Sequence, residues 1–147
     1  MSLMEQLTAD MKKAMKQGEK DRLSVIRLVR GAIRQAEIDW KKTLNDDEII
    51  DVITKEVKMR RDSIEAFERG GRIDLVDKAK FEINALRSYL PAQLSVDEVK
   101  KIVEAAIVEV KASSVKDMGK VMGVLMPRVK GRADGKLVNE LVQSMLK

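Results

Sequence analysis

The chain of 147 residues contains no cysteine and no histidine. These absences exclude disulfides, thiolate chemistry, histidine-based acid–base catalysis and ordinary zinc sites. Aromatic residues make up only 3% of the chain. The core must therefore be built from aliphatic side chains and methionine, which favours packed helices over a β-sandwich. Two prolines and eight glycines leave little material for many tight turns, which again favours helices.

Long apolar runs are missing as well. No stretch approaches the roughly 18 residues of a membrane span, and the start of the chain lacks the apolar segment of a signal peptide. We therefore expect a cytoplasmic protein without a membrane partner. The net charge of +5 permits a nucleic-acid partner but does not require one.

Hydrophobic residues recur at helical spacing and show no strand-like alternation, so we predict an all-α fold. The predicted helices cover approximately residues 2–17, 21–42, 46–69, 74–90, 96–112, 115–126 and 135–147. The first four would form an antiparallel cluster. The last three would form a small domain near the lower size limit for independent stability. A short hinge at 91–95 separates these two predicted domains, which span 1–90 and 96–147.

Side-chain caps define several of the predicted helix starts. Asn45 with Glu48, and Ser95 with Glu98, have the spacing of a capping box. Asp74 is the predicted cap of the fourth helix.

Two large or rigid side chains shape the prediction further. Trp40 falls on the apolar line of the second helix, so we expect it to face the core. Pro127 lacks a backbone donor, so the sixth helix should be kinked or end near Met126.

A basic turn between the last two predicted helices is the most distinctive stretch of the sequence. Gly131 and Gly135 can take backbone conformations closed to other residues, and Asp134 is a suitable N-cap for the final helix. A helix N-terminus exposes unpaired N–H groups and partial positive charge, which suits a phosphate when lysine and arginine lie nearby. The candidate RNA-binding residues are Lys120, Arg128, Lys130, Gly131, Arg132, Asp134, Gly135, Lys136 and Asn139.

This turn does not have the pattern of a nucleotide-hydrolysing P-loop. The Walker pattern needs four residues between its glycines and a serine or threonine after the lysine, whereas here three residues separate the glycines and Leu137 follows Lys136. The alternative to an RNA site is a glycine C-cap followed by an aspartate N-cap, and composition alone favours that capping role. No nucleophile–base pair can be assembled, so we predict no catalytic residue and no cofactor.

Three further features have simpler structural explanations. A line of cations could follow a phosphate backbone, but pairing with acids on the same helix surface is favoured. An acidic group could hold magnesium, but at a helix start it compensates the helix dipole, so no metal site is predicted. A methionine row could form an adaptable partner groove, although core filling is the commoner role. These features comprise Arg27, Arg30, Arg34 and Lys41; Asp46, Asp47, Glu48 and Asp51; and Met118, Met122 and Met126.

Three motifs, taken in order, resemble those of the YqeY-like proteins. They are Tyr89-Leu90-Pro91-Ala92-Gln93-Leu94-Ser95, Met118-Gly119-Lys120-Val121-Met122 and Lys130-Gly131-Arg132-Ala133-Asp134-Gly135-Lys136-Leu137-Val138. That family shares a domain (GatB/YqeY) with the C-terminal tail of the B subunit of glutamine-dependent aspartyl/glutamyl-tRNA amidotransferase. The resemblance covers essentially the whole chain and implies a two-part all-helical fold in a cytoplasmic, mainly bacterial protein. In the amidotransferase the tail holds the tRNA body, and the catalytic cradle lies in a separate domain for which this chain has no room.

The sequence therefore predicts a non-catalytic protein that binds tRNA or other structured RNA, alone or as an accessory to a tRNA-processing enzyme. By the resemblance, the matching turn would face the RNA, with Gly119 and Lys120 as support. A helical protein–protein adaptor without an RNA role is the alternative. An amidotransferase-related enzyme, a carbon–nitrogen ligase with glutamine as amido donor, is the least favoured class.

Overall fold

The computed structural model describes residues 1–146, which form seven α-helices and one short 3₁₀ helix with no strand in that range. The prediction of an all-α fold is confirmed. The chain divides into two compact units, Met1–Leu90 and Pro91–Lys147. No helix within the described range is both long and apolar enough to cross a bilayer.

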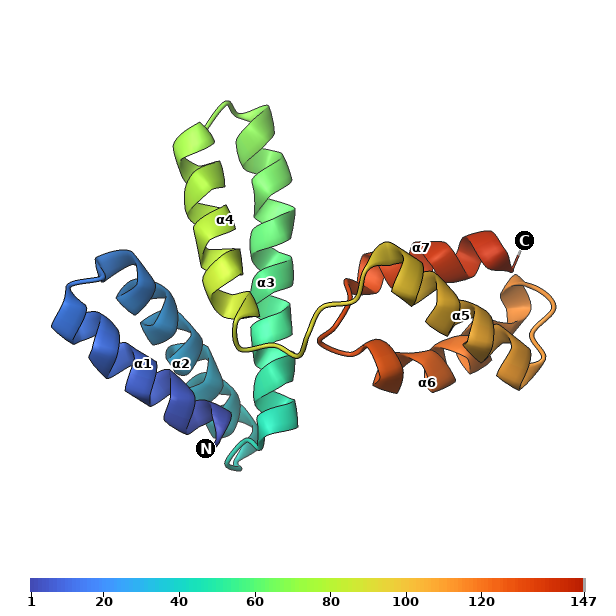
Figure 1. The fold of residues 1–147 in the computed structure, drawn as a ribbon, viewed down its shortest axis with the longest axis horizontal. Helices are drawn as coiled ribbons and strands as arrows, with labels where there is room; N and C mark the ends of the chain where they lie inside the picture. The colour runs from blue at the N-terminus through green and yellow to red at the C-terminus, as the bar shows by residue number, and fades with distance from the viewer. Residues whose placement is uncertain (147) are drawn as a thin grey trace. The chain divides into compact units, whose positions relative to one another are not determined.

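The first unit consists of two helical hairpins, α1 with α2 and α3 with α4 (Figure 1). Gly18 ends the first helix in the left-handed conformation, with a φ of 69° that glycine adopts at little cost. Asn45 and Glu48 form the predicted capping box at the start of the third. The four helices are α1 (Leu3–Gln17), α2 (Lys20–Trp40), α3 (Asp46–Arg69) and α4 (Ile73–Arg87).

Aliphatic side chains from all four helices fill the core of this unit. Leu7 of α1, Ile33 of α2 and Ile53 of α3 have no exposed surface, and Leu86 of α4 is 1% exposed. Complete burial of one such side chain is worth about 1.5–3 kcal/mol. The hydrophobic spacing in the sequence thus predicts the inward face of each helix.

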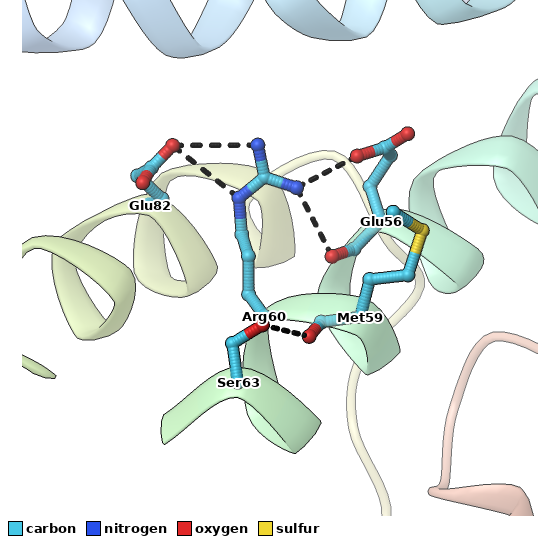
Figure 2. A network of polar contacts seen from close by, with 5 residues as sticks. All are labelled: Glu56, Met59, Arg60, Ser63 and Glu82. Atoms are coloured by element: carbon cyan, nitrogen blue, oxygen red, sulfur yellow. Dashed lines mark hydrogen bonds and ion pairs between the residues drawn. The ribbon is translucent and has the colours of Figure 1, made fainter. Parts of the chain in front are cut away.

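A largely buried polar network joins α3 to α4 (Figure 2). Arg60 donates from Nη1 to the Glu56 carboxylate at 2.7 Å, and from Nε and Nη2 to the Glu82 carboxylate at 3.3 Å. The three side chains are 16%, 20% and 13% exposed, in the order Arg60, Glu56, Glu82. Each charge therefore has a partner in a site that water reaches poorly.

A second polar contact ties the end of this unit back to α1. The Tyr89 hydroxyl donates to the Asp10 carboxylate at 2.5 Å. Burial, together with that carboxylate, raises the pKa of Tyr89 above its usual value. The tyrosine therefore stays protonated and keeps donating at neutral pH.

The second unit contains three α-helices around a core made mainly of valine. Ser95 and Glu98 form the predicted capping box at the start of its first helix. The helices are α5 (Val96–Val110), α6 (Met118–Val129) and α7 (Gly135–Met145), with the 3₁₀ helix η1 (Val115–Asp117) before α6. The buried core is Val99, Val103, Ala106, Val121, Leu125, Val129, Val138, Val142 and Leu146.

Two predicted helix boundaries are wrong. Asp74 does not cap α4; Arg72 occupies the cap position, and its guanidinium donates to the Asp74 carboxylate at 3.1 and 3.0 Å. Of the two alternatives for α6, a kink or an end near Met126, the end is also wrong, because the helix continues through Pro127 to Val129. Val129 is 1% exposed, so its burial offsets the single backbone hydrogen bond that the proline removes.

The expectation that Trp40 faces the core is wrong as well. Its side chain is 53% exposed. Trp40 keeps the register of the buried line, but it is the last residue of α2, and other elements cover only about half of its side chain. It borders a surface groove of about 450 Å³ together with Met59 of α3.

Candidate RNA interface

The basic turn connects α6 to α7 in the second unit. Beyond the last helical residue, Val129, Gly131 adopts a left-handed φ of 71°. The Arg132 N–H then donates to the Val129 carbonyl at 2.9 Å. The carboxylate of Asp134 accepts the Lys136 N–H at 3.3 Å and caps α7. Gly131 and Asp134 thus have capping roles, and Asp134 occupies part of the donor set that a phosphate would use.

The segment that precedes α5 holds this turn from the side. The Leu94 N–H donates to the Arg132 carbonyl at 2.8 Å, and Gln93 Nε2 donates to the Gly131 carbonyl at 2.8 Å. In the other direction, Arg132 Nε donates to the Ala92 carbonyl at 3.4 Å. We call these three hydrogen bonds the clasp. Through the clasp, two motifs that lie far apart in the sequence become one structural element.

An acidic side chain tempers the positive charge of the turn. The pKa of the Glu98 carboxyl lies below its usual value, chiefly because the backbone N–H and the hydroxyl of Ser95 hydrogen-bond to it. The positive charges of Arg132 and Lys101 add to this effect. A phosphate approaching Arg132 would therefore compete with both the Ala92 carbonyl and a nearby carboxylate.

The other candidate cations do not converge on a single point. Arg128 forms an ion pair with Glu109 at 2.6 Å, with side-chain exposures of 42% and 52%. Lys120 lies in the first turn of α6, ten residues before Lys130 and so about 15 Å away along the helix axis. The exposed candidates are Lys120, Arg128, Lys130, Gly135, Lys136 and Asn139. Contact of these residues with RNA remains a prediction.

The sequence-based reasoning missed the residues that hold the turn. Ala92, Gln93 and Leu94 were assigned to a hinge, yet all three contribute to the clasp. The Gln93 side chain bonds to a carbonyl 38 positions away, so no local pattern could reveal it. Only the co-occurrence of the two motifs in the family resemblance could have suggested their contact.

The acidic group lies at the start of α3, with Asp46, Asp47 and Glu48 in the first turn, where acidic side chains compensate the helix dipole. The Asp46 carboxylate accepts the Leu3 N–H at 3.1 Å, and Glu48 completes a capping box and pairs with Lys42 at 2.7 Å. Within the described range, no three or more acidic side chains are grouped so that they could hold a metal ion.

In the methionine row, core filling is confirmed for two of the three residues. Met118 and Met122 pack partly buried against the valine core. Met126 differs, because 39% of its surface is exposed. A continuous methionine groove is therefore not formed on this face of α6.

Comparison of the sequence with known proteins assigns the chain to a family. The family model described as Yqey-like protein matches residues 4–146. The chain is 32% identical over 146 residues to "Altered inheritance of mitochondria protein 41, mitochondrial" of Pyrenophora tritici-repentis, covering 95% of this chain and 78% of that protein. A protein of the same name from Eremothecium gossypii is 33% identical, covering 73% of this chain and 60% of its own length. The like-named protein of Kluyveromyces lactis is 40% identical over 58% of this chain and 47% of its own length.

These relatives correct two expectations drawn from the sequence. They are fungal proteins whose names place them in mitochondria, which contradicts the expectation of a cytoplasmic, bacterial protein. The present chain spans less than two thirds of the length of the Eremothecium and Kluyveromyces relatives. A resemblance to one family member says little about compartment, because compartment is set by targeting and not by the fold.

Proposed function

The chain belongs to the Yqey-like protein family, and from this premise we propose that its second unit binds structured RNA, with tRNA as the first substrate to test. The protein would act without catalysis, as a tRNA-binding protein or as an accessory to a tRNA-processing enzyme. The names of the fungal relatives favour the mitochondrion over the cytoplasm as the compartment of this role.

The segregation of charge within the second unit carries this proposal. Between Lys116 and Lys136 the chain has six basic and two acidic residues, whereas α5 has two basic and four acidic residues. A surface with an excess of one sign attracts a polyanion and steers its approach. The α6–α7 side of the unit would therefore meet the RNA, although Glu109 and Glu98 of α5 lie beside Arg128 and Arg132 and reduce the positive charge there.

The clasp makes the turn a fixed support for its lysines. Because the backbone on both sides of Lys130 is hydrogen-bonded, its side chain leaves from a defined position. Lysine contacts phosphate as a point charge and reads no base, so binding would follow RNA shape more than sequence. Asn139, in the second turn of α7, is the candidate for a contact with a base or ribose.

Binding of the pure full-length chain to bulk tRNA, with duplex DNA as competitor and at two salt concentrations, tests the proposal. We expect tRNA to be preferred and the affinity to fall steeply with salt. The double variant Lys130→Gln, Lys136→Gln should lose about tenfold in affinity at low salt and reduce the log–log salt slope by about two. Arg132 is unsuitable for this test, because its substitution would also remove a hydrogen bond of the clasp.

A matched control is available in the first unit. Lys12→Gln with Lys16→Gln removes the same charge from the exposed face of α1 and should change tRNA affinity by less than about twofold. An equal loss of tRNA affinity in both double variants would show that only the net charge of the protein matters, and it would overturn the proposal. Equal affinity for tRNA and duplex DNA would overturn it too.

A further inference from the structure

A line of cations runs along α2 of the first unit and ends at the C-cap of that helix, Lys41. Lys20, Arg27, Arg34 and Lys41 are spaced seven residues apart, and all four are exposed. Seven residues are about two helical turns, so the Cα atoms of Lys20, Arg27 and Arg34 rise by about 10.5 Å per step along the helix axis. Lys41 follows as the C-cap, with a left-handed φ of 54°. Within the described residues none of the four forms an ion pair.

The structure changes the membership of the line expected from the sequence. Arg30 turns inward: its Nη1 lies 3.0 Å from the Met11 sulfur, and its Nε is buried without a hydrogen-bond partner. Lys20 takes its place, one seven-residue step before Arg27. The result is a regular repeat that the irregular spacing of the predicted line concealed.

Within the described residues, no acid on α2 forms an ion pair with this cation line. Glu37 accepts the Leu44 N–H at 3.0 Å, and Asp39 accepts the Gln35 side-chain amide at 3.0 Å. Asp39 and Asp21 lie about 100° around the helix from Lys20, on the opposite edge of the exposed surface. The four cations thus lack an ion-pair partner of their own, although Glu37 lies within about one helical turn of Arg34 and Lys41.

A second row of residues lies between those two edges. It alternates steps of four and three and comprises Ser24, Leu28, Gly31, Gln35 and Ile38. Leu28 is 55% and Ile38 is 69% exposed, although both are aliphatic. A Cβ added at Gly31 would meet no atom within 4 Å, and a hollow of about 380 Å³ lies over Ser24. This row has the spacing of the a and d positions of a coiled coil, and the cations occupy the adjoining g positions; in the same register Asp21, three residues before Ser24, is an a position beside Lys20.

We propose that this face of α2 docks an acidic amphipathic helix of a partner protein. The partner would carry Glu or Asp at every seventh residue opposite the cation line and small or aliphatic residues opposite the row of Leu28 and Ile38. A seven-residue line drifts by about 20° per heptad around a straight helix, and a second helix crossing at about 20° follows it. Gly31 and the hollow over Ser24 allow the close approach that such packing needs.

A nucleic-acid duplex fits this surface less well. The cation line is about 32 Å long, close to one turn of a duplex at roughly 34 Å. Each strand crosses a straight line along the duplex only about once per turn, so only about two of the four cations could contact phosphates at the same time. Only two aliphatic side chains support the contact, so we expect weak, salt-sensitive binding to a protein helix.

Two synthetic peptides test this inference on the full chain. One is a four-heptad helix with Glu at every e and g position, and the other has the same composition with Glu moved to the b and c positions. Binding is measured by isothermal titration calorimetry, with each peptide shown to be monomeric beforehand. We expect the first peptide to bind about tenfold more tightly and to lose this advantage in high salt.

Charge reversal on both sides identifies the surface. Arg27→Glu with Arg34→Glu should abolish binding of the Glu peptide, and a peptide with Lys at the same e and g positions should bind this variant instead. The control is Lys12→Glu with Lys16→Glu on α1, which reverses the same charge and should leave Glu-peptide binding unchanged. Circular dichroism of each variant verifies that the helices are intact.

Three outcomes would overturn the inference. Equal binding of both Glu peptides would show non-specific attraction. Loss of tRNA affinity in the α2 variant with unchanged peptide binding would assign the line to RNA. A dimer of the chain alone that the α2 variant disrupts, seen by analytical ultracentrifugation, would assign the face to a second copy of the chain.

Discussion

The two units of this protein position their cations by different means. In the first, helix periodicity sets the cation line from Lys20 to Arg34, because α2 is regular over its 21 residues, and Lys41 follows as the C-cap. In the second, the cations surround a turn whose shape depends on hydrogen bonds to a segment about 38 positions away. A surface of the first kind persists as long as its helix does. A surface of the second kind persists only while the whole unit is folded, so its function should follow the stability of that unit.

The cores of the two units also differ in the size of their side chains. The buried cluster of the first unit contains five isoleucines, three leucines and three valines. That of the second contains six valines, two leucines and one alanine. Smaller side chains bury less apolar area, and a smaller domain buries a smaller share of its surface. The second unit should therefore be the less stable of the two.

Removal of a large side chain from the weaker core tests this difference and should have the largest effect. Leu125 is fully buried, so Leu125→Ala should cost about 2–5 kcal/mol. A unit of 57 residues has only about 3–9 kcal/mol in total. We expect the helical signal of the second unit to be lost early in a urea titration followed by circular dichroism.

The single tryptophan provides the control for this titration. Trp40 lies in the first unit, so its fluorescence transition should not move in the Leu125→Ala variant. Ile53→Val in the first unit should do the reverse, shifting the Trp40 transition by about 0.5–1.5 kcal/mol and leaving the second unit unchanged. If both signals shifted together in either variant, the two units would not be energetically separate.

The network around Arg60 should give the next largest effect. Arg60→Ala removes a guanidinium that two poorly hydrated carboxylates share, Glu56 and Glu82. We expect a loss of about 1.5–3 kcal/mol in the Trp40 transition. Arg72→Ala breaks the exposed pair with Asp74 and should cause no measurable change. Equal effects of the two variants would show that burial does not decide the value of these pairs.

The same contrast explains how much the sequence could reveal. The capping boxes at Asn45 and Ser95, and the aliphatic core positions, were predictable because their signals lie within a few residues. Trp40 was misplaced because periodicity gives direction around a helix but not where the core ends. In the candidate site, periodicity predicted the helix start at Asp134, while the clasp needed tertiary structure. Long-range hydrogen bonds leave no period in a sequence.

Substitutions at two glycines should change the stability of the second unit by a smaller amount. They distinguish the turn at Gly131 from helix α6 at Gly123. Gly131→Ala forces a β-carbon into a left-handed backbone of φ 71° and should destabilise the second unit by about 1–2 kcal/mol. Gly123→Ala, within α6, places a β-carbon where no atom lies within 4 Å and should stabilise the unit by about 0.5–1 kcal/mol. Urea titrations of both variants measure the difference. Destabilisation by Gly123→Ala would indicate a crowded surface there.

The contribution of Glu98 to the stability of the second unit should depend on pH, and it should be the smallest of these effects. Its folded-state pKa lies below the ordinary 4.5, chiefly through hydrogen bonds from Ser95. A lowered pKa means that the charged form stabilises the fold, so this contribution is present above pH 4.5 and is lost as the pH falls below it. Glu98→Gln keeps an acceptor for Ser95 but cannot ionise. Its Tm for the second unit should be lower than that of the native chain at pH 7, and this difference should shrink as the pH falls below 4.5.

A variant of the neighbouring residue Asp97 shows whether Glu98 acts through the capping box or only through its negative charge at the helix start. Asp97→Asn removes one charge from the same first turn of α5 but leaves both capping-box hydrogen bonds in place. If Glu98 acts through those bonds, the Asp97 variant should show the smaller difference in Tm at pH 7. Equal differences would assign the effect to the helix dipole. Since the segment before Ser95 also carries the clasp, Glu98→Gln should weaken the support of the basic turn, and Asp97→Asn should not.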